Sequence, residues 1–140
     1  MSDAELSDPS DPDGMGFWSE RHLCTLATVR KDGTPHLVPV GVTYDPQTGI
    51  ARIITSSTSA KARHIARSGP VPAAVSQVDG GRWTTLEGLA RVNQDPDAVA
   101  DAVRRYAKRY RQPGENPLRV VIEIEVHRVL GSVKVPLPRA

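Results

Sequence analysis

Hydrophobic and polar residues alternate with a period of two along most of the chain, which is typical of β-strands that bury one face. In the clearest run, His36 to Tyr44, every second residue from His36 faces one side, and Leu37, Pro39, Gly41 and Thr43 face the other. The pattern predicts strands over residues 23–29, 36–44, 50–55, 71–78, 83–92 and 120–127. Glycine-containing turns at residues 30–33 and 79–81 predict hairpins between neighbouring strands.

The strand over residues 36–44 contains two residues that interrupt regular pairing. Pro39 has no amide hydrogen to donate, so this strand is expected at a sheet edge or broken where another element approaches. Gly41 has no side chain and leaves room for such an approach.

Three segments have helical signals. Residues 17–21 predict a short helical turn, and residues 60–68 predict a helix that ends at Gly69-Pro70. Asp95-Pro96 predicts the start of a third helix, with an apolar stripe through Val99 and Tyr106 and basic residues near its end. Because no βαβ alternation runs through the chain, we expect a mainly β fold whose antiparallel sheet closes into a small barrel, with helices packed outside.

The length of 140 residues fits one domain. Residues 1–14 are acidic and rich in Ser, Asp, Pro and Gly, which predicts a disordered tail followed by one domain over residues 15–140. We found no apolar run long enough to span a membrane, no signal-peptide pattern, and a single cysteine, Cys24. These features predict a cytoplasmic protein without a membrane partner.

Charge is unevenly distributed. Beyond the tail the chain carries 18 basic and 11 acidic residues, and 14 of the basic ones are arginine. Such an excess has two interpretations: a solvated surface, or a site for an anionic ligand such as a phosphorylated cofactor or a carboxylated substrate. The aromatic content of 4% argues against nucleic acid as the anion, because base stacking needs aromatic side chains.

Side-chain catalytic motifs are missing from the sequence. It has no dinucleotide-binding or phosphate-loop glycine pattern and no Gly-x-Ser-x-Gly elbow, and the four histidines fit no metal-site spacing. Cys24 lies in an apolar strand and is interpreted as a core residue. We therefore predict no metal site and name no catalytic residue; an enzyme of this sequence would need a borrowed cofactor.

The segment from Thr55 to Lys61 is the best candidate for binding an anion. Its hydroxyls precede a helix N-terminus, where free amides and the helix dipole favour a phosphate. Five hydroxyl side chains, from Thr55 to Ser59, lead into the helix, Lys61 and Arg63 follow one turn in, and Arg52 lies on the strand just before. The alternative is an ordinary Ser cap on a surface helix.

Two further residues, Gln77 and Trp83, follow on later strands. A tryptophan at a strand start is usually a core or interface residue. Beside a phosphate site in a small barrel it could instead form the wall of a pocket for a flat ring.

Several short segments resemble the split β-barrel flavin and deazaflavin oxidoreductases related to pyridoxamine 5′-phosphate oxidase, over about residues 17–135. They occur in order and without large gaps: residues 19–23, 35–36, 40–41, 50–55, 59–63, 76–80, 86–88, 105–111 and 119–123. Within the family the resemblance is greatest to the actinobacterial reductases that use reduced coenzyme F420 to convert biliverdin to bilirubin.

The resemblance implies a split β-barrel, a homodimer with active sites at its interface, and coenzyme F420 as hydride donor. It implies ring contacts from the strand residues His36, Val38, Pro39, Val40 and Gly41. It also implies that the phosphate and the anionic tail are held by Thr55, Ser57, Ser59 and Lys61, and that the site is closed by Gln77 and Trp83, from the same or the partner subunit. Ser59 stands where some relatives carry Arg, which implies a looser grip on the anionic cofactor tail. FMN as the cofactor, another conjugated substrate, or a non-catalytic flavin- or tetrapyrrole-binding role remain the alternatives.

Overall fold

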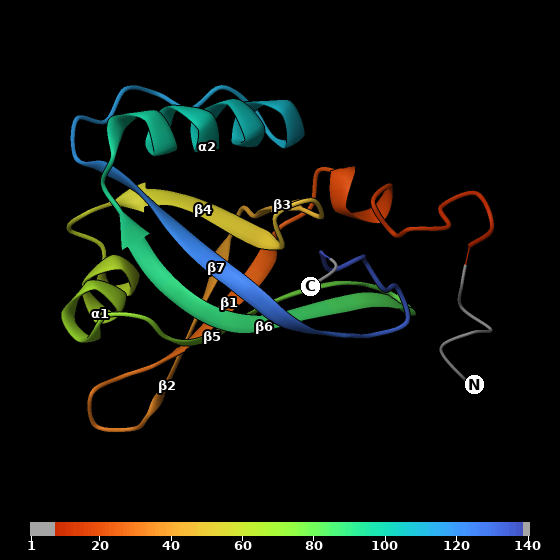
Figure 1. The fold of residues 1–140 in the computed structure, drawn as a ribbon, viewed down its shortest axis with the longest axis horizontal. Coiled ribbons are helices and arrows are strands. Elements are labelled where there is room, and N and C mark those ends of the chain that lie inside the picture. Colours follow the sequence, from red (N-terminus) through yellow and green to blue (C-terminus); the bar gives the residue numbers. More distant parts are fainter. Residues whose placement is uncertain (1–7, 139–140) are drawn as a thin grey trace.

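Seven antiparallel strands form one sheet in the computed structural model, which describes residues 8–138 (Figure 1). The strands are β1 (Cys24–Val29), β2 (Pro35–Val40), β3 (Thr43–Asp45), β4 (Ile50–Ser56), β5 (Val71–Asp79), β6 (Arg82–Asn93) and β7 (Arg119–Leu130). They pair in the order β2-β1-β5-β6-β7-β4-β3. The predicted strands are all present, and the mainly β, antiparallel architecture is confirmed.

The two edge strands, β2 and β3, are consecutive in the chain and are separated only by Gly41 and Val42. The sheet therefore curls until its edges meet at this break, which makes the barrel a split one. The segment over residues 36–44 is thus both at the sheet edge and interrupted, as Pro39 and Gly41 led us to expect, and the break lies at Gly41. A Cβ on Gly41 would lie 2.8 Å from Cε2 of Tyr106, and the amide of Val42 donates to the hydroxyl of Tyr110 at 3.0 Å instead of to a neighbouring strand.

The expectation that Pro39 lies on an edge strand is confirmed, because β2 pairs only with β1. Alternation along this segment also holds: Val40, Val42 and Tyr44 are buried, whereas Leu37 and Pro39 are exposed. The break at Gly41 thus preserves which residues face the core.

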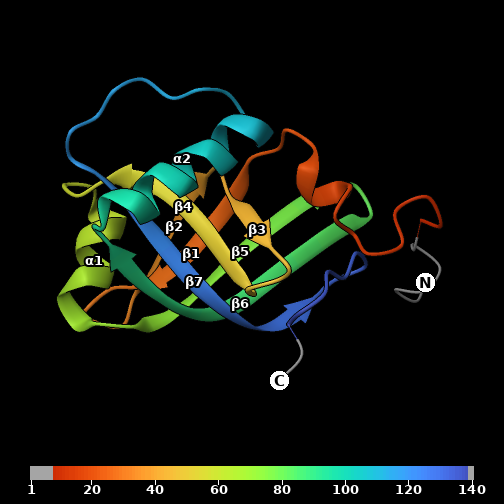
Figure 2. The same ribbon diagram turned by 45° about the horizontal axis from the view of Figure 1, so that its top comes forward.

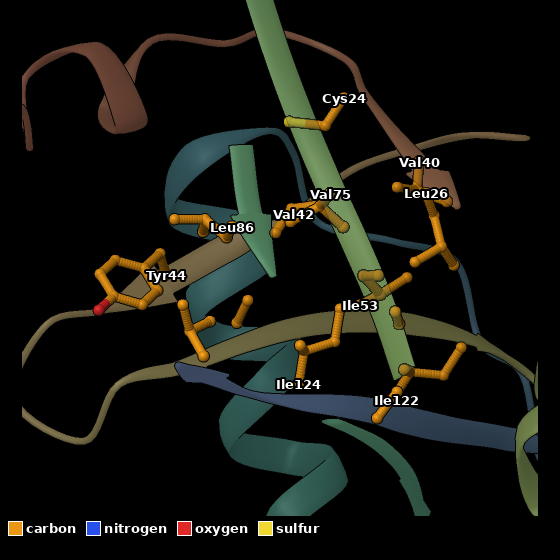
Figure 3. Packing of buried hydrophobic residues seen from close by; sticks show 14 of the residues in the cluster. Cys24, Leu26, Val40, Val42, Tyr44, Ile53, Val75, Leu86, Ile122 and Ile124 are labelled. Atoms are coloured by element: carbon orange, nitrogen blue, oxygen red, sulfur yellow. The ribbon is translucent and has the colours of Figure 1, made fainter. Parts of the chain in front are cut away.

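Side chains from the inner face of the curled sheet form one hydrophobic core (Figure 3). Leu26, Ile53, Val75, Leu86 and Ile122 are at most 1% exposed, so strands from both halves of the sheet contribute to it. Burial of each such side chain is worth about 1.5–3 kcal/mol, and this core is the main force that holds the barrel closed.

Three helical segments lie outside the sheet: η2 (Phe17–Ser19), α1 (Ala60–Ser68) and α2 (Pro96–Arg109). The first residues of η2 are buried, α1 contacts β1 and β6, and α2 crosses β3, β4 and β7 (Figure 2). Gly69, with φ of +70°, follows α1, and Pro96 starts α2, as predicted. Of the helices within residues 8–138, none is both long and apolar enough to cross a membrane.

The predicted acidic tail is only partly described. Residues 1–7 lie outside the described residues, and residues 8–14 form turns. The carboxylate of Asp11 accepts hydrogen bonds from the amides of Gly16 at 2.7 Å and Phe17 at 2.9 Å. The boundary between tail and domain at residues 14 and 15 stays a prediction.

Candidate functional site

A cleft of about 300 Å³ lies where α1, α2, the break between β2 and β3, and the adjoining ends of β4 and β7 come together. The loop that follows α2 forms one of its walls and returns beside the helix (Figure 2). The lining residues are Pro39, Val40, Gly41, Ile53, Ile54, Thr55, Ser56, Lys61, Tyr106, Pro113, Asn116 and Arg119.

The N-terminus of α1 opens beside this cleft with unpaired backbone donors. Ser59 caps the helix: its Oγ accepts from the amide of Ala62 at 3.2 Å, and its carbonyl accepts from the amide of Arg63 at 3.0 Å. Within the described residues, the amides of Ala60 and Lys61 donate to no acceptor. Free amides at the positive end of a helix are the usual partners of a phosphate.

Two cations, Lys61 and Arg119, line the same end of the cleft. Arg119 lies directly across from Ser56 in the β4–β7 ladder, and its Nη2 donates to the carbonyl of Gly114 at 2.7 Å. Burial lowers the pKa of Lys61, which forms no ion pair with any residue in the described range. Since the lining includes no carboxylate, this end of the cleft favours an anion.

The remaining walls are apolar or backbone. Residues 39–41 contribute a strand end, β4 contributes Ile53 and Ile54, and α2 contributes the ring of Tyr106. Such a surface suits a flat, largely apolar group attached to the anion.

A family model described as pyridoxamine 5′-phosphate oxidase matches residues 13–132. The chain belongs to this family. The match covers all seven strands, and membership of the family accounts for the split β-barrel.

Individual proteins agree with the family assignment. The chain is 58% identical over 120 residues, 86% of each protein, to an F420H(2)-dependent biliverdin reductase of Mycobacterium tuberculosis (strain CDC 1551 / Oshkosh). A solved F420 reductase matches with a TM-score of 0.66 and 25% identity, over 82% of this chain and 94% of that one. The heme storage protein HutZ of Vibrio cholerae shares the fold alone, with a TM-score of 0.69 and 13% identity over 86% of this chain and 93% of that one.

Five of the residues that the sequence suggested line the cleft: Pro39, Val40, Gly41, Thr55 and Lys61. Ser57 and Ser59 lie beside it in the turn before α1; the hydroxyl of Thr55 donates to Ser59 Oγ at 3.1 Å, and the amide of Ser57 donates to the Leu118 carbonyl. The turn that leads into α1 therefore caps the helix and also borders the cleft.

Three predicted ligands lie on other surfaces of the same elements. Val38 packs against the hydrophobic core, and His36 lies edge-to-face with His64 of α1, with ring centroids 5.0 Å apart. Arg63 is exposed and lines a separate groove on α1 together with His64 and Arg67.

Arg52 lies beneath α2 instead of in the cleft. Its Nε is 3.9 Å from Asp101 Oδ2, and its side chain is 11% exposed. Residues alternate along β4, so Arg52 lies on the same face of the strand as Ile54 and points to the helix. The carboxylates of Glu123 and Asp45 also lie near its guanidinium and act to raise its pKa. Burial nevertheless leaves the pKa of Arg52 lowered.

Gln77 and Trp83 do not reach the cleft of their own chain. Gln77 is fully buried and hydrogen-bonded to Phe17 and Arg109. Trp83 is 38% exposed near the start of β6, in the part of that strand that lies far along the ladder from the cleft. Neither residue lines the cleft in a single chain.

Sequence reasoning missed seven lining residues: Ile53, Ile54, Ser56, Tyr106, Pro113, Asn116 and Arg119. The sequence alone does not reveal Tyr106 and Arg119, because each comes from a distant part of the chain. Tyr106 of α2 packs against Gly41, and Arg119 lies opposite Ser56 where β7 pairs with β4. Among the residues that the structure describes, no group of three or more His, Cys, Asp or Glu residues could hold a metal ion.

Proposed function

We propose that this protein transfers a hydride from reduced coenzyme F420 to the central methine of biliverdin, while a proton from solvent is added at a pyrrole nitrogen, producing bilirubin. Two things support the proposal: the identity of 58% to an F420H(2)-dependent biliverdin reductase, and a cleft whose chemistry suits a phosphorylated, flat-ringed cofactor. When bound, the reduced deazaflavin supplies the hydride.

The observation that carries the proposal is the cationic end of the cleft. Unpaired amides at the start of α1 adjoin Lys61 and Arg119, and no carboxylate faces them. In the proposed complex, Thr55, Ser59 and Lys61 hold the phosphate, and the backbone of residues 39–41 orients the ring. Fixing the ring against substrate and keeping water out are then the main contributions of the chain.

We also propose that the protein works as a homodimer, built on the outer face of β1, β2, β5 and β6. Ladder pairing puts Ala27 beside Leu37 and Val78 beside Trp83, and Leu23, Leu37 and Val78 are 60–66% exposed. Exposed apolar side chains gathered on one face in this way favour association. Pro39, paired with Thr25 on this face, also lines the cleft, so a partner would lie next to it and could contribute Trp83.

An anaerobic assay tests the proposal. The purified chain is mixed with reduced F420, and absorbance follows the oxidation of F420 and the conversion of biliverdin to bilirubin. We expect F420 oxidation only when biliverdin is present. Equal or faster turnover with reduced FMN would support the flavin-dependent alternative, and tight tetrapyrrole binding without turnover would support a binding protein.

Analytical ultracentrifugation tests the dimer separately. We expect twice the 15.2 kDa chain mass for the wild type and a monomer for Leu37→Asp, which places a charge in the apolar face. A wild-type monomer with full activity would rule out the shared site.

A further inference from the structure

A second cavity, of about 260 Å³, lies between η2, β3 and α2 and shares no lining residue with the cleft. Its residues are Met15, Trp18, Ser19, Thr43, Tyr44, Arg105, Lys108 and Arg109. Neither the proposed hydride transfer nor the proposed dimer uses this cavity.

The walls of the cavity differ in character. Arg105, Lys108 and Arg109 come from successive turns of α2 and form a cationic side, whereas Met15, Trp18 and Tyr44 supply apolar and aromatic surface. No carboxylate lines it. A ligand that satisfies both sides needs an apolar body and a negative charge.

The three cations are not equally available. Arg109 is buried and donates to the carbonyls of Glu20 and Val42 and to Gln77. Arg105 is paired with Asp101 at 2.9 Å and lies 3.6 Å from Asp45. Within residues 8–138, Lys108 pairs with no carboxylate and makes no side-chain hydrogen bond, so its charge is the one left for a ligand.

The indole of Trp18 also borders the cavity. Trp18 is 2% exposed, yet its buried Nε1 donates to no acceptor in the described residues. The great majority of buried polar side-chain atoms in folded proteins have a hydrogen-bond partner. Because Nε1 is itself covered, a ligand in the cavity lies beside the indole and changes its NMR signal without bonding to it.

We infer that this cavity is a binding site for a small aromatic carboxylate. Its ring packs against Trp18 and Tyr44, and its carboxylate pairs with Lys108. The volume lies just below the range of about 300–1,000 Å³ usual for drug-sized ligands, so the site takes a single-ring compound and excludes a tetrapyrrole.

Nitrogen-15 NMR of the full-length chain tests the site with benzoate as the probe. The protein has two tryptophans, so the indole signal of Trp83 serves as an internal reference, assigned with Trp83→Phe. We expect a saturable shift of the Trp18 indole signal and none for Trp83. Neutral benzamide, which has the same shape, should bind about tenfold more weakly, because it lacks the charge.

Two variants locate the charge that binds. Lys108→Met should weaken benzoate binding about five- to tenfold, whereas Arg111→Met, which removes an exposed cation just beyond α2, should leave it unchanged. An unshifted Trp18 signal, equal affinity for benzamide, or equal losses in both variants would each overturn the inference. Because no F420 or biliverdin is present, failure of the proposed reaction would not alter these results.

Discussion

The guanidinium of Arg109, at the end of α2, donates to the side-chain carbonyl of Gln77 on β5. Arg109 is 8% exposed, and its Nε and Nη1 also donate to the carbonyls of Glu20 at 2.9 Å and Val42 at 2.6 Å. The amide nitrogen of Gln77 in turn donates to the carbonyl of Phe17 at 3.0 Å. One buried pair thus joins α2, η2, β5 and the break between β2 and β3.

Replacing Gln77 with Leu should lower the free energy of unfolding by about 3 kcal/mol, because a buried guanidinium donor and the Phe17 carbonyl both lose their partner. Urea denaturation monitored by circular dichroism measures the change. Gln47→Leu, at an exposed turn position, is the matched control and should cost less than about 0.5 kcal/mol.

The same variant separates two roles for Gln77. The resemblance implied that this residue closes the cofactor site, whereas its contacts within the chain are structural. If Gln77→Leu unfolds like the wild type but binds F420 much more weakly, the ligand role is correct and the structural one is not.

Sequence patterning predicted the strands well because one face of each is buried in a single core, which forces a period of two. Pro39 and Gly41 indicated an interruption, but the sequence could not show what approaches it, because the rings of Tyr106 and Tyr110 are more than 60 residues away in the chain. Contacts with these two rings therefore divide the segment over residues 36–44 into two strands.

The candidate site was predicted in part for the same reason. The turn from Thr55 to Lys61 is local, so its hydroxyls and helix start could be recognised from the sequence. Arg52 lies three residues before Thr55, yet the strand turns it to the opposite face, where Asp101 of α2 lies. Arg119 joins the cleft only because β7 pairs with β4.

Lys61→Ala should weaken F420 binding by about 1–3 kcal/mol, the cost of a lost charge-assisted contact. Arg63→Ala removes a cation two residues away that is exposed and lies outside the cleft, so it should change affinity little. Fluorescence titration of the coenzyme gives both dissociation constants. Equal losses would mean that general charge, not the cleft, attracts the coenzyme.

Ser59→Asp separates the helix cap from the phosphate site. Aspartate caps a helix as well as serine, so the free energy of unfolding should stay within about 0.5 kcal/mol of the wild type. The added negative charge lies beside the proposed phosphate and should lower F420 affinity at least tenfold. Ser59→Ala should lose about 1 kcal/mol of stability, and it should weaken F420 binding much less than Ser59→Asp, because it removes one phosphate contact without adding a negative charge. Unchanged F420 binding in Ser59→Asp would show that the phosphate does not bind at the start of α1.

Asp101 makes stability depend on pH. Its hydrogen bond to Arg105 lowers its pKa, against the opposing effect of burial. Because the folded-state pKa is depressed, the stabilisation is present above the unfolded value of about 3.9 and is lost as pH falls through the folded value. The stability difference between the wild type and Asp101→Asn should therefore shrink below about pH 4. Urea titrations at several pH values test this, with Asp97→Asn, exposed in the first turn of α2, as control. A difference that is constant down to pH 2 would mean that the ion pair contributes nothing.

Gly41→Ala tests whether the break between β2 and β3 shapes the cleft. The new methyl group would lie 2.8 Å from Tyr106 and 3.2 Å from Tyr110, so α2 must move outward. Overpacking of this kind costs about 1–3 kcal/mol of folding free energy. Since Tyr106 also lines the cleft, F420 affinity should fall in the same variant. The double variant Gly41→Ala/Tyr106→Leu removes the nearer ring and should regain part of the stability lost on adding the methyl group, relative to Tyr106→Leu alone. If the two changes are additive instead, the ring of Tyr106 is not what requires glycine at position 41.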